Sequence, residues 1–288
     1  MRFAATIAVA LAATALAAPA GARTWEQTWT ELGPHPAVHV TTNDARVRIH
    51  RGAAGRVDAT VEYTLQFWGL HSRVNDPEIT MTREGETINI SARSRSNIIV
   101  FGGVNERFHV DVTLPPDCDV KVHSGDGSVE CEPVHGAVDL QTGDGHITVH
   151  GIRGSTRLWT GDGGIDADGL DGDLDARTGD GHLHVAGRFD RLNVRSGDGR
   201  VEAIIQRGSV LAEPWSLASG DGGITVRIPR NLQALLAATA HDGTVHVELP
   251  IDTGRQANHH QLRGELNGGR VPLRVRTGDG PITFALSE

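Results

Sequence analysis

Lysine is nearly absent from this sequence, and acidic residues outnumber basic ones. Lys121 is the single lysine, and 36 Asp and Glu residues against 27 Lys and Arg residues give a net charge of −9. An acidic chain is repelled by phosphate groups, so neither nucleic acid nor an anionic membrane surface is expected as its main partner. After the N-terminal segment, no stretch approaches the ~18 apolar residues that a membrane span requires.

Motifs of the common enzyme classes are also missing. The sequence contains no Gly-x-Ser-x-Gly elbow, no His-Glu-x-x-His pair and no phosphate-binding loop. Polysaccharide-active enzymes use exposed carboxylates on β-helices, and Asp166, Asp168, Asp173 and Asp175 resemble such a set. Carboxylates at this density are expected of any acidic soluble repeat protein. No enzyme activity is therefore predicted, and a polysaccharide-active enzyme ranks as the third interpretation.

Residues 1–22 are predicted to form a secretory signal peptide. Arg2 precedes an apolar stretch from Ala4 to Ala18, and Ala20-Gly21-Ala22 supplies the small residues of a cleavage site before Arg23. No cysteine that could carry a lipid anchor follows this stretch directly. We therefore expect a periplasmic or secreted mature protein.

Only two cysteines occur, Cys118 and Cys131, and both lie in the predicted mature chain. An exported protein enters an oxidising compartment, which favours a disulfide between them over a pair of buried free thiols. Residue parity points both side chains inward near one corner of the predicted fold. The disulfide would close a loop of about 14 residues and stabilise the chain by about 3 kcal/mol.

A Ser/Thr-Gly-Asp-Gly motif recurs every 18 residues, starting at Ser124, Thr142, Thr160, Thr178 and Ser196. Less regular copies start at Ser219, Ala240 and Thr277, and a worn copy starts at Thr42. Between the motifs, apolar residues alternate in two short runs bounded by glycine, which indicates two strands and two tight turns per repeat. A two-stranded unit cannot bury its apolar face alone, so the units must stack.

The predicted fold is therefore all-β, a single-chain, two-sheeted parallel β-solenoid with 18-residue rungs. Stacking places equal repeat positions in columns. One inward column comprises Val129, Ile147, Ile165, Leu183 and Val201, and the opposing one comprises Leu140, Leu158, Ala176 and Val194. Residues 23–115 are predicted to form irregular first rungs and a cap, continuous with a repeat region over residues 116–288. The apolar runs 67–70 and 98–101 are assigned to this cap rather than to a binding loop.

The Ser/Thr-Gly-Asp-Gly motifs, the segment from Leu262 to Gly269 and the final stretch from Thr277 to Ile282 resemble a bacterial β-strand-repeat family labelled as candidate adhesins. The sequence is also similar to head-GIN type domains. The resemblance implies a repetitive β-architecture and an adhesin-like role at the cell envelope or surface. The family has no assigned function, so the resemblance implies no catalytic or binding residues.

The Asp of each turn invites a calcium interpretation, because stacked carboxylates bind calcium in nonapeptide-repeat toxins. The spacing differs from the nine-residue spacing of those toxins, so structural turns are preferred. In this interpretation the carboxylates accept hydrogen bonds from turn amides and the glycines supply positive φ. The predicted turn residues are Asp126, Asp144, Asp162, Asp180, Asp198, Asp221, Asp242 and Asp279.

Histidines and aspartates alternate on the outward side of three successive rungs, at His146, His150, Asp166, Asp168, His182 and His184. Such residues can hold zinc. The spacing, however, fixes no compact set of three ligands, so cross-strand pairs on a solvated face are preferred. No metal and no cofactor are predicted.

Trp159 has outward parity, with Gln141 on the rung before it and Arg177 and Arg195 on the rungs after it. An exposed Trp among arginines can stack on a sugar ring, or it can make a cation–π contact that shields it. The cation–π contact is the preferred interpretation, and Trp159, Arg177 and Arg195 are the candidate ligand surface.

Two hypotheses about function follow. The first is a non-enzymatic binding module of the cell envelope or surface that recognises a glycan or a protein. The second is a structural or assembly scaffold of the envelope that binds no small ligand.

Overall fold

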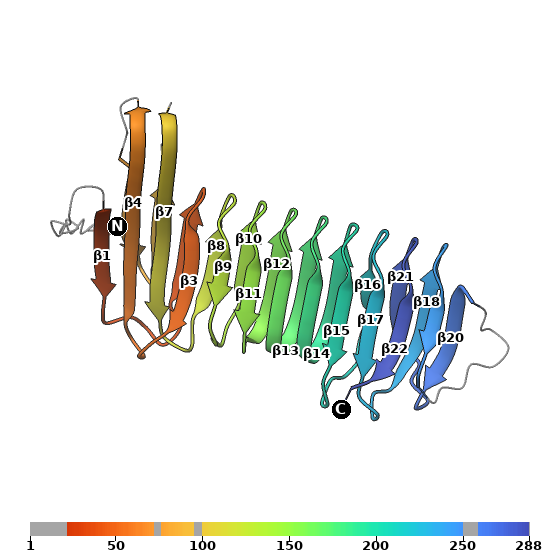
Figure 1. Cartoon of the computed structure of the whole chain (residues 1–288). Coiled ribbons are helices and arrows are strands. Elements are labelled where there is room, and N and C mark those ends of the chain that lie inside the picture. The colour runs from red at the N-terminus through yellow and green to blue at the C-terminus, as the bar shows by residue number, and fades with distance from the viewer. Residues whose placement is uncertain (1–21, 72–75, 95–99, 250–258, 288) are drawn as a thin grey trace, which may run out of the picture.

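The structure is a computed structural model that describes residues 22–71, 76–94, 100–249 and 259–287. The predicted signal peptide lies outside these residues except for Ala22. The described chain is all-β, with 22 strands in one mixed sheet that runs as a long row (Figure 1). No helix in this part of the chain is long and apolar enough to cross a membrane.

The repeat region contains the most regular strands, and their apolar alternation follows the predicted parity. They are β8 (Asp119–His123), β9 (Val129–Cys131), β10 (Val138–Thr142), β11 (Ile147–His150), β12 (Arg153–Thr160), β13 (Ile165–Thr178), β14 (Leu183–Ser196) and β15 (Val201–Ile205). Neighbouring strands pair in parallel with partners one motif period apart, as Leu140 with Leu158 and Leu158 with Ala176.

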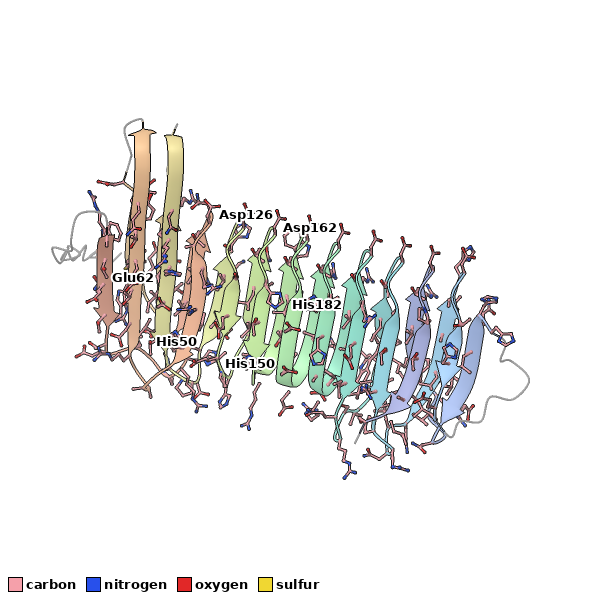
Figure 2. The ribbon with its side chains drawn as sticks, viewed as in Figure 1. His50, Glu62, Asp126, His150, Asp162 and His182 are labelled. Atoms are coloured by element: carbon pink, nitrogen blue, oxygen red, sulfur yellow. The ribbon has the colours of Figure 1, made fainter. Side chains whose placement is uncertain are left out.

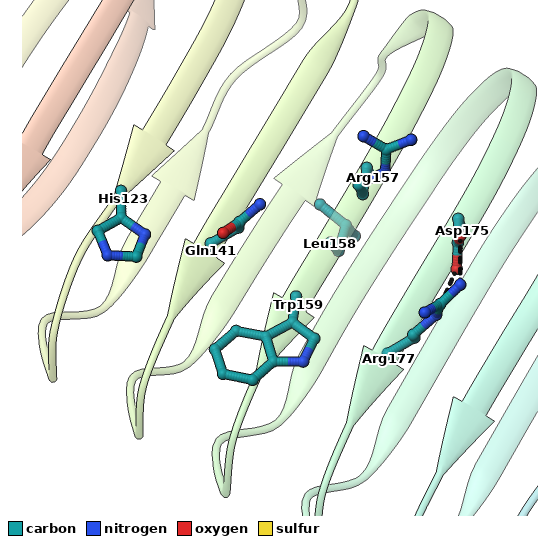
Figure 3. Close-up of a pocket in the computed structure, with 7 residues that line it drawn as sticks. All are labelled: His123, Gln141, Arg157, Leu158, Trp159, Asp175 and Arg177. Carbon is teal, nitrogen blue, oxygen red and sulfur yellow. Dashed lines mark hydrogen bonds and ion pairs between the residues drawn. The ribbon is translucent and has the colours of Figure 1, made fainter.

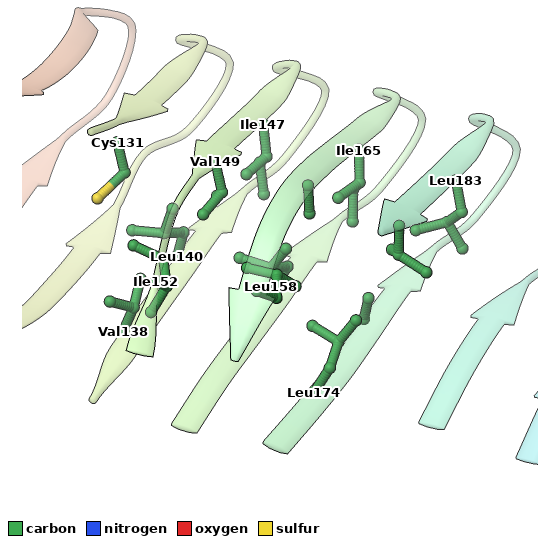
Figure 4. Packing of buried hydrophobic residues seen from close by; sticks show 14 of the residues in the cluster. Cys131, Val138, Leu140, Ile147, Val149, Ile152, Leu158, Ile165, Leu174 and Leu183 are labelled. Atoms are coloured by element: carbon green, nitrogen blue, oxygen red, sulfur yellow. The ribbon is translucent and has the colours of Figure 1, made fainter. Parts of the chain in front are cut away.

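The pairings form two ladders, and the long strands β13 and β14 contribute one half to each. The first halves of β13 and β14 continue the ladder of β9 and β11, whereas their second halves continue the ladder of β8, β10 and β12. Both predicted apolar columns are buried. Figure 4 shows Ile147 and Ile165 of one column on the ladder opposite Leu140 and Leu158 of the other. Alternation with period two therefore predicted the core of this part correctly.

The N-terminal strands are β1 (Ala22–Trp29), β2 (Ala37–Thr42), β3 (Arg46–Arg51), β4 (Val57–His71), β5 (Glu78–Glu84), β6 (Thr87–Arg93) and β7 (Val100–Leu114). β2 and β3 pair in parallel with β8 and β9. β4 and β7 form a long antiparallel pair that reaches beyond the other strands (Figure 1). The backbone of residues 67–70 lies in this pair, whereas Ile98 and Ile99 lie outside the described residues.

The C-terminal strands are β16 (Trp215–Ala218), β17 (Ile224–Ile228), β18 (Ala234–Ala240), β19 (Val245–Val247), β20 (Gln261–Leu266), β21 (Pro272–Thr277) and β22 (Ile282–Leu286). β21 and β22 insert between β16–β17 on one side and β18–β19 on the other. The expectation that each repeat pairs with the next one in sequence is therefore wrong here, and also at β2 and β3, which lie between β6–β7 and β8–β9.

The prediction of a purely parallel fold is corrected at the ends of the row. β1 pairs antiparallel with β4, β4 with β7, β5 with β6, and β18 with β20. At the N-terminal end β1 and β5 are thus held by antiparallel pairing, and at the C-terminal end β20 is. Antiparallel end strands interrupt the regular edge, where another chain could otherwise add a strand.

The turns at the repeated motif differ in two respects from the prediction. The Ser and Thr hydroxyls, not the Asp carboxylates, bond the turn: Thr142 Oγ1 donates to the carbonyls of Gly125 and Gly127, each at 3.0 Å, and accepts from the Gly145 amide at 3.3 Å. All eight predicted Asp residues are exposed, and none accepts a hydrogen bond from the described residues. Because the buried hydroxyl already satisfies the turn, the carboxylates face solvent, as Figure 2 shows for Asp126 and Asp162.

The glycines of the motif also have a different role from the one predicted. None of them has positive φ, and the positive-φ glycines of the regular repeats lie elsewhere, as at Gly151 and Gly169. A Cβ on the second motif glycine would instead meet the carbonyl oxygen of its counterpart one rung earlier, at 2.0 Å for Gly163 and 1.9 Å for Gly181. Close stacking of backbone on backbone therefore requires glycine at these positions.

Candidate functional site

Trp159 lies on the outer face of β12, next to the motif turn that begins at Thr160. Its neighbours Leu158 and Thr160 are buried, and the alternation of the strand turns the indole outward. The side chain is 45% exposed, whereas Trp29 and Trp215 are buried. Among the described residues, Val210 is the one other exposed large apolar side chain.

The indole forms part of an open groove of about 670 Å³ across β8, β10, β12 and β13 (Figure 3). Six further residues line the groove, namely His123, Gln141, Arg157, Leu158, Asp175 and Arg177. Leu158 is the buried member of this set, and the others present planar polar groups: an imidazole, an amide, two guanidinium groups and a carboxylate. A flat apolar ring among planar hydrogen-bonding groups can hold a ligand that has both a flat apolar face and polar edges.

The strand register explains which residues come together. Gln141, Trp159, Arg177 and Arg195 are successive partners on neighbouring strands, as their common repeat position predicts. Of the predicted surface, Trp159 and Arg177 line the groove, whereas Arg195 lies one rung further and does not. His123, Arg157 and Asp175 belong to the groove but not to the predicted surface. The sequence could have indicated them by position, because His123 shares the column of Gln141 and Trp159, and Arg157 and Asp175 stand two residues before that column.

Arg177 faces away from the indole, toward Asp175 (Figure 3). Its Nε and one terminal nitrogen donate to the two Asp175 oxygens at 3.0 and 2.8 Å, and Asn193 donates to the same carboxylate at 3.1 Å. No aromatic or cation–π contact of Trp159 is found within the described residues. The predicted cation–π contact that would shield the indole is therefore not formed, and the ring face stays open.

Cys118 and Cys131 are both buried and carry separate thiols in the structure. Cys131 lies in an inward column with Val149 (Figure 4), and each sulfur contacts the carbonyl of the following residue, at 3.4 Å for Cys118 and 3.6 Å for Cys131. Burial raises the pKa of both thiols to about 12. The inward parity of both residues agrees with their burial, and the disulfide between them stays a prediction.

A compact set of metal-ligating side chains is present, contrary to the expectation from the spacing. One ligand atom each from His146, Asp166 and His182 lies within 4.8 Å of the other two. His150 and Asp168 are strand partners, as are Asp166 and His184, as the columns predicted. The columns alone did not reveal the compact set, because its two histidines lean toward each other across an intervening rung.

Comparison with known families shows which family the chain belongs to. The family described as Toastrack DUF4097 matches residues 36–284. The chain belongs to the Toastrack DUF4097 family. The match begins before β2 and therefore covers β2 to β7 of this Toastrack chain as well as its repeats. The similarity to a bacterial β-repeat family of unknown function agrees with this finding, whereas a specific likeness to head-GIN domains is not shown.

Solved structures that are similar to the Toastrack chain include proteins from Parabacteroides and Bacteroides species. A candidate lipid-binding protein from Parabacteroides distasonis is 14% identical, with 92% of this chain and 97% of that chain covered and a TM-score of 0.49. A candidate adhesin from Bacteroides fragilis is 9% identical, with 91% and 96% covered and a TM-score of 0.41. None of the curated proteins compared with the chain matches it.

Proposed function

We propose that this chain is a non-enzymatic, adhesin-like binding module of the cell envelope or cell surface, and that its ligand is a glycan bound at the Trp159 groove. In this proposal the protein is exported to the periplasm or the exterior. A two-sheeted solenoid with 18-residue rungs, set by the Gly-Asp-Gly spacing, presents the groove on one flat face. The irregular residues 23–115 cap the repeat region, residues 116–288.

The open face of Trp159 is the observation that carries the proposal. A Trp side chain that is 45% exposed leaves a large apolar surface in water, and no described residue covers it. Stacking a sugar ring on the indole would remove this surface from water while sugar hydroxyls bond the polar edges. Gln141 offers one amide donor and one carbonyl acceptor, and Asp175 offers acceptors that Arg177 holds in place.

A glycan array probed with the purified chain tests this proposal. The parent protein should bind a defined group of envelope glycans, and Trp159→Ala should weaken that binding about tenfold or more, as loss of ~1.5 kcal/mol of aromatic stacking predicts. Val210→Ala is the matched control, because Val210 is also exposed and apolar but lies outside the groove. Its binding should equal that of the parent.

The same variants, used also in an envelope pull-down and in a measurement of self-association, separate the glycan proposal from its alternatives. If the parent binds no glycan but captures one envelope protein, and Trp159→Ala loses this capture, the ligand of the groove is a protein. Self-association without any ligand, unchanged in Trp159→Ala, would favour the structural scaffold. Equal glycan binding by the parent and Trp159→Ala would refute the groove as the site.

A further inference from the structure

The compact His146, Asp166 and His182 set lies on the outward side of the other ladder, just after three successive motif turns. His146 directly precedes β11, Asp166 is the second residue of β13, and His182 directly precedes β14. His146 and His182 occupy the same repeat position two rungs apart, and Gly164 is their counterpart on the rung between. Backbone bonds join the three rungs here: the Ile147 amide donates to the Gly164 carbonyl at 3.0 Å, and the Ile165 amide to the His182 carbonyl at 2.9 Å.

Gly164 leaves the gap that lets the two imidazoles meet. Side chains two rungs apart start about 9.6 Å from each other, at ~4.8 Å per strand. The two ring centroids nevertheless lie 5.6 Å apart, tilted by 38°. A Cβ on Gly164 would lie 2.4 Å from His182 Cε1 and 3.0 Å from His146 Cε1, so both rings lean over the space that a larger residue would fill.

The Asp166 carboxylate lies between the two imidazoles. Its Oδ2 is 2.9 Å from His146 Nε2, and its Oδ1 is 3.6 Å from His182 Nε2. A tetrahedral zinc ion with bonds of about 2.0–2.2 Å needs ligand atoms roughly 3.3–3.6 Å apart. One ligand atom from each of the three side chains lies within 4.8 Å of the other two, so binding requires them to move together by roughly 1 Å. The three side chains are 39%, 38% and 57% exposed, which leaves room for water to complete the coordination.

The ratio of histidines to carboxylates in this set differs from that in the neighbouring ion pairs. His184 is one histidine that contacts two carboxylates, Asp168 at 3.3 Å and Glu202 at 3.5 Å. In the compact set, one carboxylate, that of Asp166, instead faces two imidazoles. Two imidazole nitrogens and one carboxylate oxygen are ligand types that zinc binds in proteins.

We propose that His146, Asp166 and His182 form a binding site for one divalent transition-metal ion, with zinc as the representative ion. Imidazole nitrogen with carboxylate oxygen selects borderline ions such as zinc over calcium and magnesium. Exposed carboxylates of the adjacent motif turns, including Asp162 and Asp180, add a negative field that attracts cations. The site is separate from the Trp159 groove and does not depend on the glycan proposal.

Calorimetric titration of the purified, untagged chain with zinc tests the proposal. The parent should bind one zinc ion per chain, and cobalt at the same site should give visible d–d absorption. The double variant His146→Gln/His182→Gln should lose this binding. Gly164→Ala retains every ligand but fills the gap, and it should weaken zinc binding about tenfold or more, which is the loss caused by removing groups that orient ligands.

Three controls separate this site from general histidine binding and from the groove. Gly223→Ala changes the glycine at the corresponding position after another motif, where a Cβ would meet Pro281 instead of histidines. His150→Gln removes the histidine at the end of β11, the strand that follows His146. Trp159→Ala alters the groove. All three should bind zinc like the parent. Absence of saturable binding to the folded parent, or equal binding by the parent and the double histidine variant, would overturn the proposal.

Discussion

Replacing Gly163 by Ala tests whether close stacking is the reason for the second motif glycine. The added Cβ would lie 2.0 Å from the Gly145 oxygen, 2.6 Å from the Gly145 carbonyl carbon and 2.8 Å from Thr160 Oγ1. Cβ atoms do not approach other heavy atoms more closely than about 3.0 Å, so the two rungs must separate by roughly 1 Å at this point.

Such a separation breaks hydrogen bonds as well as packing. Thr160 Oγ1 donates to Gly143 O at 3.2 Å and to Gly145 O at 2.9 Å, and an added 1 Å takes both beyond the normal range. Because the Thr160 hydroxyl has one hydrogen to share between the two carbonyls, its loss costs about 1 kcal/mol, and about 1–3 kcal/mol for overpacking brings the total to about 2–4 kcal/mol. For a chain of this size the melting temperature should fall by about 4 °C or more.

Thermal melting, with hydrogen exchange of the repeat region, measures this effect. Gly164→Ala is the matched control, because the Cβ there meets only movable imidazole tips. Gly163→Asn distinguishes close stacking from positive φ, since Asn tolerates positive φ and should be as harmful as Ala at this site. At Gly169, where φ is +65°, Asn should be less harmful than Ala. A Gly163→Ala variant that melts with the parent would refute the stacking argument.

Two further predictions concern the cysteines and a histidine. Protein expressed with its export signal, unfolded without reductant and then alkylated, should show Cys118 and Cys131 as a disulfide by intact mass. Unfolding must come first, because buried thiols with a pKa of about 12 react slowly with the alkylating reagent. Two alkylated thiols would contradict the prediction. Hydrogen bonding to Glu132 and Asp111 raises the pKa of His50 above 6.5, so the stability it contributes is present below that pH and is lost as pH rises through the raised pKa. His50→Gln should therefore lower the melting temperature at about pH 5.5 and not at about pH 9, and an equal effect at both would exclude this linkage.

The regular part of this protein was predictable because one residue pattern repeats with a fixed period. Alternation with period two determined which side chains face the core, and the period determined which residues become neighbours on adjacent strands. The inward position of Ile147 and Ile165 and the outward position of Trp159 followed from these two rules. Both rules concern the backbone, which is nearly identical from rung to rung.

Side-chain direction between rungs was not predictable in the same way. The sequence places His146 and His182 two rungs apart, and nothing in that spacing says that both rings lean over Gly164. Arg177 likewise adopts one of several rotamers, the one that donates to Asp175 and leaves the Trp159 face open. Local sequence does not determine such choices, because they depend on which space the neighbouring rung leaves empty.

The sequence by itself determined the all-β class, the parity of each repeat strand and the columns of the core. Only the tertiary structure decided that β21–β22 enter the row ahead of β18–β19 and that antiparallel pairs occur at both ends of the row. It also decided that the motif glycines serve close stacking rather than positive φ. The physical reason is that strand alternation is a local property of the backbone, whereas strand order and contact across rungs arise from packing between segments far apart in the chain.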